Sequence, residues 1–155
     1  MSESKELILS VMRAQGKADA LDLRSRANDM DGTAIIAERE KAPEWQADKD
    51  YSAWPVGAPV RDEGRTYALI QPHNAAHYPD TRPATLPALW SLQHTKDPSR
   101  VEPYLAPNGQ SGMYMTGECC TEGGHVYRST MDNNVWSPSG YPSGWEDLGE
   151  VSTDA

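Results

Sequence analysis

Residues 54–67 read Trp-Pro-Val-Gly-Ala-Pro-Val-Arg-Asp-Glu-Gly-Arg-Thr-Tyr, and residues 114–127 read Tyr-Met-Thr-Gly-Glu-Cys-Cys-Thr-Glu-Gly-Gly-His-Val-Tyr. With an offset of 60 residues, an aromatic residue, a glycine, a small apolar residue, a second glycine and a tyrosine align without a gap. Each stretch is followed by Pro-x-x-Trp, at residues 87–90 and 142–145. Internal repetition indicates related structural units, and glycine between two short apolar runs is typical of a β-hairpin. The sequence therefore predicts two small, related antiparallel β-modules.

The chain of 155 residues divides into four parts by composition. Residues 1–42 are expected to be helical, residues 43–97 and 109–150 to form the two β-modules, and the proline-containing residues 98–108 to form a semi-rigid linker. The predicted class is therefore α+β, a short helical segment followed by two β-modules. Modules of this size bury little surface, so large aromatic side chains are expected to supply much of each core. The expected core aromatics are Tyr67, Trp90, Tyr127 and Trp145.

The N-terminal segment carries an apolar stripe at helical spacing. The stripe consists of Leu7, Ile8, Val11 and Met12. Gly16 is expected to end this helix, a second helix to end at Asp31-Gly32, and Thr33 to cap a third. So few large apolar groups cannot build a stable domain, and the stripe needs a partner surface. That surface is another copy of the chain, a different protein, or the chain's own β-modules, and we expect residues 1–42 to attach or oligomerise the protein.

The repeated framework resembles the small chitin- and cellulose-binding modules found at the ends of bacterial glycoside hydrolases. Their pattern runs Trp, Tyr-x-x-Gly-Asp/Glu, a short strand, Gly-x-x-Tyr and a closing Pro…Trp. The matching residues are Trp45, Tyr51, Gly57, Val60, Gly64, Tyr67 and Trp90 in the first copy, and Tyr114, Gly117, Glu118, Gly124, Tyr127 and Trp145 in the second. The whole layout is also similar to that of small proteins from bacteriophage tail operons, on residues 35–45, 70–75 and 90–98. This resemblance implies a virion protein with modules of carbohydrate-binding type.

The charge of the chain limits its partners. A net charge of −9 argues against nucleic acid, an anionic membrane and a polyanionic wall polymer, and leaves a neutral polysaccharide open. The sequence contains no run of 18 apolar residues, so it predicts no membrane span. The N-terminus is acidic and is not typical of a secretory signal. The protein is therefore expected to be made in the bacterial host cytoplasm and to leave it within a particle or by lysis.

No catalytic or metal-binding pattern is complete. His73 and His77 lie four residues apart, but in a segment rich in Pro and Asn. Cys119 and Cys120 lack further zinc ligands and are expected to be reduced, with Cys120 filling the core position of Val60. Most of the carboxylates that glycosidase chemistry could pair fall in turns, where they are ordinarily solvated; the candidates are Asp62, Glu63, Glu118, Glu122 and Asp132. We expect no cofactor, no metal and no enzymatic activity.

Exposed aromatic rings are the expected means of sugar binding, because they stack against the apolar faces of sugars. In the family that the chain resembles, an exposed aromatic doublet follows the tyrosine after the hairpin. This chain has Leu69-Ile70 and Ser129-Thr130 nearby instead, so chitin or cellulose binding does not carry over. The candidate carbohydrate-binding residues are therefore aromatics outside the core positions: Trp54, Tyr78, Trp136 and Tyr141.

These features predict a non-enzymatic virion protein of a phage or phage-like particle. Residues 1–42 are expected to contact other virion proteins or further copies of the chain, and the β-modules to bind a host-surface glycan. One alternative is a purely structural role, as decoration or in tail-fibre assembly, with no glycan ligand. Another is an accessory module of a secreted hydrolase, which the missing signal peptide disfavours.

Overall fold

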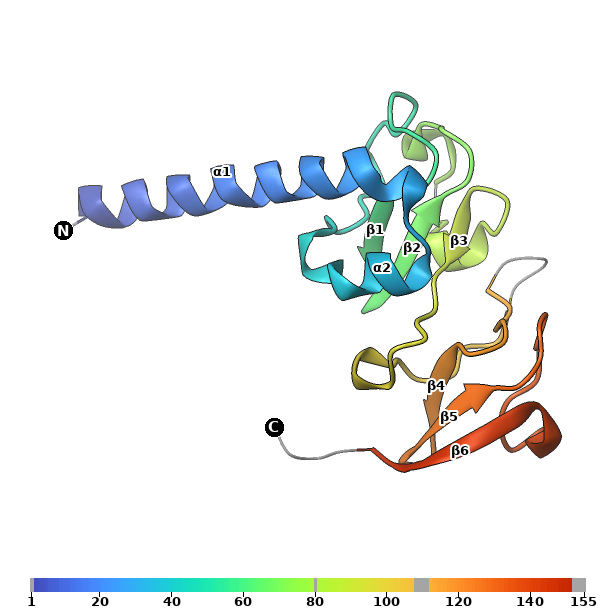
Figure 1. The fold of residues 1–155 in the computed structure, drawn as a ribbon. Helices are drawn as coiled ribbons and strands as arrows, with labels where there is room; N and C mark the ends of the chain where they lie inside the picture. Colours follow the sequence, from blue (N-terminus) through green and yellow to red (C-terminus); the bar gives the residue numbers. More distant parts are fainter. Residues whose placement is uncertain (1, 80, 108–111, 152–155) are drawn as a thin grey trace.

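The structure is a computed structural model that describes residues 2–79, 81–107 and 112–151. It confirms the α+β class, with a helical N-terminus followed by two three-stranded antiparallel sheets of order β1-β2-β3 and β4-β5-β6 (Figure 1). The elements are α1 (Ser2–Arg26), α2 (Gly32–Ala37), β1 (Pro59–Asp62), β2 (Arg65–Leu69), β3 (Trp90–Leu92), β4 (Cys119–Glu122), β5 (His125–Ser129) and β6 (Trp145–Glu150).

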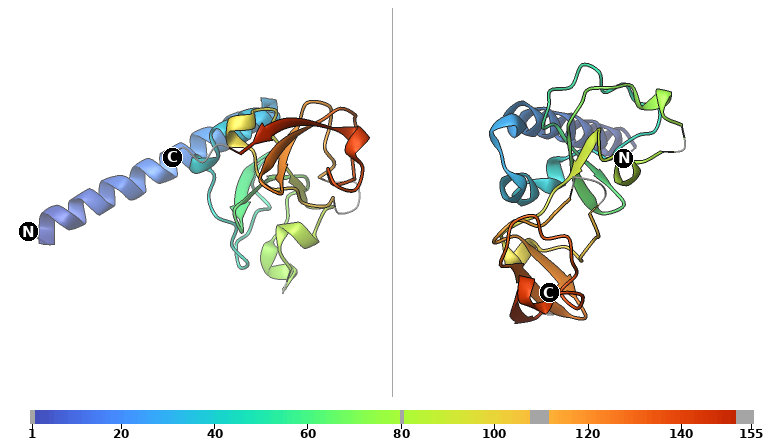
Figure 2. Two further views of the ribbon diagram at one scale, coloured as in Figure 1. Left: turned by 90° about the horizontal axis from the view of Figure 1, so that it is seen from below. Right: turned by 90° about the vertical axis from the view of Figure 1, so that its right-hand side faces the viewer.

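Residues 2–26 form one long helix rather than two. α1 continues through Gly16, which was expected to end it, and its N-terminal part projects away from the sheets (Figures 1 and 2). A glycine inside a helix costs only about 1 kcal/mol relative to alanine. The expected stop is wrong because one glycine is too weak to end a helix whose neighbouring residues are mostly good helix formers.

The apolar stripe on α1 is not covered by the chain's own modules. Leu7, Ile8, Val11 and Met12 are each at least 59% exposed. Packing of the stripe against the β-modules, one of the three alternatives above, is therefore wrong for this structure.

The rest of the N-terminal segment is part of the first module's fold. Leu23 and Ala27 near the end of α1 are buried, as are Ile35 and Ile36 in α2. A division of the chain after residue 42 therefore cuts through packed structure, and the freely projecting part ends before Leu23.

The start of α2 differs from the expectation in its capping residue. The side chain of Asp31 caps the helix by accepting a backbone N–H three residues on, whereas the hydroxyl of Thr33 accepts the backbone N–H of Lys96 at 2.9 Å. A β-carbon at Gly32 would lie 2.4 Å from the carbonyl oxygen of His94, so the first residue of α2 must be glycine for the two segments to approach.

The two sheets share one backbone framework. Gly57 and Gly117 both have a φ of 93°, a conformation that favours glycine. The backbone N–H of Gly57 donates to the carbonyl of Leu69 at 2.8 Å, and that of Gly117 donates to the carbonyl of Ser129 at 2.9 Å. The repeat inferred from the sequence is therefore present in the hydrogen bonding of the strands.

A short edge segment runs beside the first strand of each sheet. The N–H of Trp45 donates to the carbonyl of Arg61 at 2.8 Å, and the N–H of Tyr104 donates to that of Thr121 at 2.9 Å. The second module therefore starts earlier than expected, and part of the segment taken as a linker belongs to it.

The gap-free alignment fails at its first aromatic residue. The N–H of Tyr114 donates to the carbonyl of Asn134 at 3.0 Å, and the matching bond in the first module, to the carbonyl of His73 at 2.7 Å, comes from Tyr51. Tyr51 and Tyr114 are both fully buried, whereas Trp54 is only partly buried. Trp54 thus lies in a short insertion of the first module and matches Tyr114 in sequence only.

The repeated core positions are equivalent at one pair and different at the other. Val60 pairs with Tyr67 across the first hairpin as Cys120 pairs with Tyr127 across the second. Val60 and Cys120 are both fully buried, as expected, and Cys119 and Cys120 are both free. Tyr67 is buried, but Tyr127 is half-buried, so the expectation of equivalent buried tyrosines is wrong.

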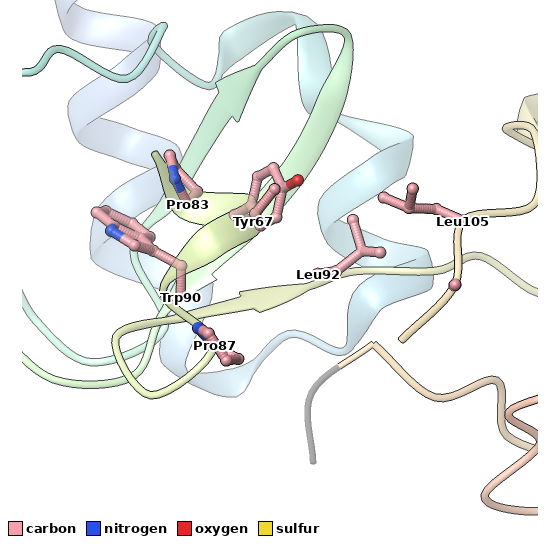
Figure 3. Close-up of a pocket in the computed structure, with 8 residues that line it drawn as sticks. Tyr67, Pro83, Pro87, Trp90, Leu92 and Leu105 are labelled. Carbon is pink, nitrogen blue, oxygen red and sulfur yellow. The ribbon is translucent and has the colours of Figure 1, made fainter. Parts of the chain in front are cut away.

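Tyr67 is buried because remote segments of the chain cover it. Pro83 and Pro87 come from the long segment before β3, and Leu105 comes from the start of the second module; all three line one small apolar pocket with Tyr67 (Figure 3). The pocket encloses about 80 Å³, well below the roughly 300 Å³ or more of typical ligand sites. The pocket is a packing gap between the modules, and the residues that line it shield Tyr67 from solvent.

The modules also meet at a buried histidine. The ring of His94 stacks on that of Tyr114, with centroids 3.6 Å apart, and its Nε2 lies 2.7 Å from the carbonyl oxygen of Gly112. Arg65 of the first sheet donates to the carbonyl of Pro103 at 2.6 Å. These contacts join the two sheets into one unit.

Burial of His94 predicts a loss of stability in acid. Desolvation lowers the pKa of His94 from 6.5 to about 4, so the folded protein holds the neutral imidazole. Above pH 6.5 the imidazole is neutral in both the folded and the unfolded chain, and the free energy of unfolding keeps its full value. As the pH falls from 6.5 towards 4, the unfolded chain takes up a proton that the folded chain excludes, so the free energy of unfolding decreases by up to about 3 kcal/mol. Urea unfolding of the wild type and of His94→Gln at several pH values should show a shallower decline for the variant across this window. Parallel declines in the two proteins would contradict the prediction.

Candidate carbohydrate-binding surface

Two of the four predicted sugar-binding residues form an exposed pair of rings. Trp136 and Tyr141 lie in the loop between β5 and β6, with ring centroids 5.1 Å apart and planes inclined at 53°. Their exposed fractions are 46% and 42%. The sequence indicated each residue separately, and the structure brings them together; we call them the ring pair.

A buried asparagine holds the loop that carries the ring pair. Asn134 is fully buried, and its Nδ2 donates to Oγ of Ser129 at 3.1 Å and to the carbonyl of Gly144 at 3.0 Å. Its Oδ1 accepts the backbone N–H of Trp136 at 3.2 Å. Asn134 therefore ties both ends of the loop together and fixes the backbone beneath the first ring.

Two core aromatics support the same loop from below. The indole N–H of Trp145 donates to the carbonyl of Trp136 at 3.1 Å, and the hydroxyl of Tyr104 donates to the carbonyl of Val135 at 2.8 Å. The backbone of Trp136 is thus anchored while its side chain remains in solvent. Because the backbone beneath the ring is already ordered, a ligand that stacks on the ring need order only the side-chain torsions of Trp136.

Polar groups lie in the stretch of loop between the two rings. The backbone N–H of Ser139 donates to Oε1 of Glu122 at 2.8 Å, and that of Tyr141 donates to the carbonyl of Ser137 at 3.0 Å. The serine hydroxyls and the Glu122 carboxylate supply hydrogen-bonding groups in the same loop and its adjoining strand. Stacking rings with a few polar groups nearby can bind a sugar.

The two predicted residues of the first module are arranged differently. Trp54 packs edge-on against Tyr51, and the guanidinium of Arg24 lies 4.3 Å from its ring centroid, so this cation–π contact occupies part of the indole. Tyr78 is 40% exposed and makes an edge contact with His73. Each of these two rings in the first module therefore contacts other residues, whereas Trp136 and Tyr141 contact each other.

Trp54 also borders an open groove between α1 and the segment that follows α2. The groove has a volume of about 390 Å³, and Lys17, Arg24 and Lys49 line it with Trp54. Its cationic lining contrasts with the acidic character of the chain as a whole.

The candidate carboxylates for glycosidase chemistry have structural partners. Asp62, expected in a solvated turn, is buried and accepts a hydrogen bond from Nε of Arg82 at 3.0 Å. Glu118 accepts the backbone N–H of Met115 at 2.7 Å, and burial raises its pKa. Both carboxylates help to fix the fold.

Among residues 2–79, 81–107 and 112–151, no group of three or more His, Cys, Asp or Glu side chains is placed to hold a metal ion. Within the same ranges, no helix combines the length and the apolar character needed to cross a membrane.

Sequence reasoning missed the residues that position the ring pair. Asn134 and Tyr104 carry no sugar-binding signal of their own, since one lies within an Asp-Asn-Asn run and the other in the expected linker. No known protein family matches the chain, and no curated protein matches its sequence.

Proposed function

We propose that this protein is a non-enzymatic adhesion protein of a phage or phage-like particle and binds a host-surface glycan through the ring pair. The observation that carries the proposal is the exposure of Trp136 and Tyr141 side by side on an anchored loop. An exposed indole needs a reason, because its large apolar surface favours burial. A sugar stacked on the ring pair supplies that reason.

The net charge favours an uncharged ligand. At −9 the chain repels polyanionic polymers at long range, so a neutral glycan is the preferred partner of the ring pair. Stacking on one or two rings contributes about 0.5–1.5 kcal/mol for each ring beyond the area buried. A single site should therefore bind in roughly the high-micromolar to millimolar range, and adhesion should depend on several sites acting together.

Trp136→Ala is expected to reduce glycan affinity by up to about tenfold, because up to about 1.5 kcal/mol of stacking free energy is lost. The fold should be retained, since the Trp136 ring is 46% exposed. The measurement is a glycan array followed by titration of the best ligand. Trp136→Phe should restore part of the affinity, and Val56→Ala, which removes another exposed apolar group, should have no effect. Equal binding by wild type and Trp136→Ala would refute the ring pair as the site.

Assignment to a particle rests on the sequence resemblance to tail-operon proteins. Mass spectrometry of purified particles from a bacterium that encodes the chain tests it directly, and absence of the protein from those particles would refute the assignment. Trp54 and Tyr78 remain the predicted contribution of the first module, to be tested by alanine substitution in the same titration.

One observation favours the structural alternative. Leu69 and Ile70 stand near the position where the resembled family carries its exposed aromatic doublet, and Leu69 is buried. A chain that is present in particles but binds no cell-wall or capsular glycan from a plausible host would support a role in decoration or tail-fibre assembly.

A further inference from the structure

The projecting part of α1 carries a second pattern besides the stripe already described. Apolar residues recur at alternating intervals of four and three, which is the spacing of a coiled-coil heptad. With Leu7 and Leu21 assigned to d positions, the apolar residues are Leu7 (d), Val11 (a), Ala14 (d), Ala18 (a) and Leu21 (d). We call these five residues the seam.

Only the last residue of the seam, Leu21, borders the chain's own modules, where it lines the groove beside Trp54. All five of its residues are exposed. Leu23, which is buried against the first module, lies two residues after Leu21 and therefore about 200° around the helix axis from it. Leu23 thus packs on the chain from the side of α1 opposite the seam, and a partner that covers the seam from Leu7 to Ala18 displaces no contact of Leu23.

We propose that a second copy of this chain covers the seam in a parallel, two-stranded coiled coil. Leu7 and Leu21 at d and Val11 at a fit this assembly, because leucine at d with a β-branched residue at a favours two strands. The charges beside the seam fit it too. In a parallel pair each g residue faces the e residue five positions later in its partner, which places Lys17 beside Asp22 of the other copy.

Asp22 is accessible to a partner, although its carboxylate also accepts hydrogen bonds from Arg26 of its own helix. Its carboxylate lies 2.8 Å from the guanidinium of Arg26 one turn later, and its side chain is 55% exposed. Ala14 and Ala18 allow the two backbones to approach closely but bury little area, so the dimer is expected to dissociate on dilution. The inference does not depend on the glycan proposal, since it rests on the exposure and spacing of residues in α1 alone.

The first experiment is a pair of charge substitutions on the projecting helix, read out by mass in solution. Light scattering of the full chain between about 1 and about 200 µM should show a shift from one chain of 17.1 kDa to twice that mass. Val11→Asp should stay monomeric across this range, whereas Met12→Asp should dimerise like the wild type. The two side chains are matched in exposure, at 60% and 63%, but only Val11 lies on the seam.

Near-ultraviolet circular dichroism of the tryptophans is the folding control, because no tryptophan lies in α1. A wild-type chain that remains monomeric at the highest concentration would overturn the proposal. So would monomeric Met12→Asp, or a Val11→Asp variant with an intact tryptophan spectrum that still dimerises.

The second experiment tests the direction of the helices. Leu7→Cys should form a covalent dimer under mild oxidation, because a parallel pair places the two copies of residue 7 side by side. Leu9→Cys should cross-link far more slowly, since residue 9 lies about 200° around the helix from residue 7. The natural cysteines are both buried and leave this readout clear. Equal cross-linking of the two variants, or none for Leu7→Cys, would overturn the parallel arrangement.

Discussion

Tyr114→Ala is expected to destabilise the protein by about 3–5 kcal/mol, the range found when large aromatic side chains are removed from a core. Tyr114 is fully buried, stacks on His94, and lies 5.6 Å from the ring of Tyr104 and 5.1 Å from that of Trp145. Its hydroxyl also accepts the backbone N–H of Leu105 at 3.3 Å. Urea unfolding followed by tryptophan fluorescence measures the change, and the second module should unfold first or together with the junction.

Tyr127→Ala is the matched control for this substitution. Tyr127 lies on β5 in the same small module and pairs with Cys120, but it is only half-buried. Its truncation should cost about 1 kcal/mol, the usual value for a substitution that opens no core cavity. Equal losses for the two variants would show that the core of the second module has been assigned wrongly.

Asn134→Asp is expected to cost about 3–5 kcal/mol at neutral pH. The change turns the two donors of a fully buried amide into acceptors that face the carbonyl of Gly144 and the hydroxyl of Ser129. The variant either buries an unpaired charge or takes up a proton to avoid it, and both are unfavourable. Thermal or urea unfolding measures the loss, and any residual folded protein should bind glycan more weakly because the loop beneath Trp136 is released.

Asn133→Asp is the control from the adjacent position. Asn133 is exposed and has a φ of 54°, which asparagine and aspartate both tolerate. The same chemical change there should alter stability by no more than about 0.5 kcal/mol. A comparable loss at residues 133 and 134 would show that burial of the Asn134 amide is not the cause.

The hairpins were predictable from the sequence because their geometry is local. Glu63-Gly64 has φ values of 52° and 78°, and Gly123-Gly124 has values of 57° and 82°. Two successive residues with positive φ form the turn that joins twisted strands most directly, and glycine adopts it without strain. The offset of 60 residues therefore reflects a shared turn and a shared register of strands.

Burial could not be predicted from the repeat, because distant segments decide it. Tyr67 and Tyr127 occupy the same strand position, yet only Tyr67 is covered, by the long segment before β3 and by Leu105. The stacking of His94 on Tyr114 likewise joins residues 20 positions apart that no periodic pattern relates. The repeat predicts the backbone, whereas the cover over each side chain depends on insertions that the two copies do not share.

The individual residues of the candidate site could be predicted from the sequence, but their arrangement in space could not. Trp136 and Tyr141 stand out because each is an aromatic residue in a polar loop, and that signal holds for each alone. Their proximity depends on Asn134 closing the loop. Trp54 gave the same kind of signal, but Arg24 of α1, 30 positions away, lies over its ring, and no local pattern predicts that contact.

Because α1 is uninterrupted, its length sets the distance between its N-terminal end and the folded modules. At about 1.5 Å per residue, Leu7 lies roughly 24 Å along the helix axis from Leu23, a residue of α1 that is buried against the first module. A partner that binds the projecting N-terminal part of α1 lies away from the ring pair and does not compete with it for space. For the adhesion role proposed above, the separation between the glycan and whatever binds the start of α1 would be set by the number of residues in a single helix.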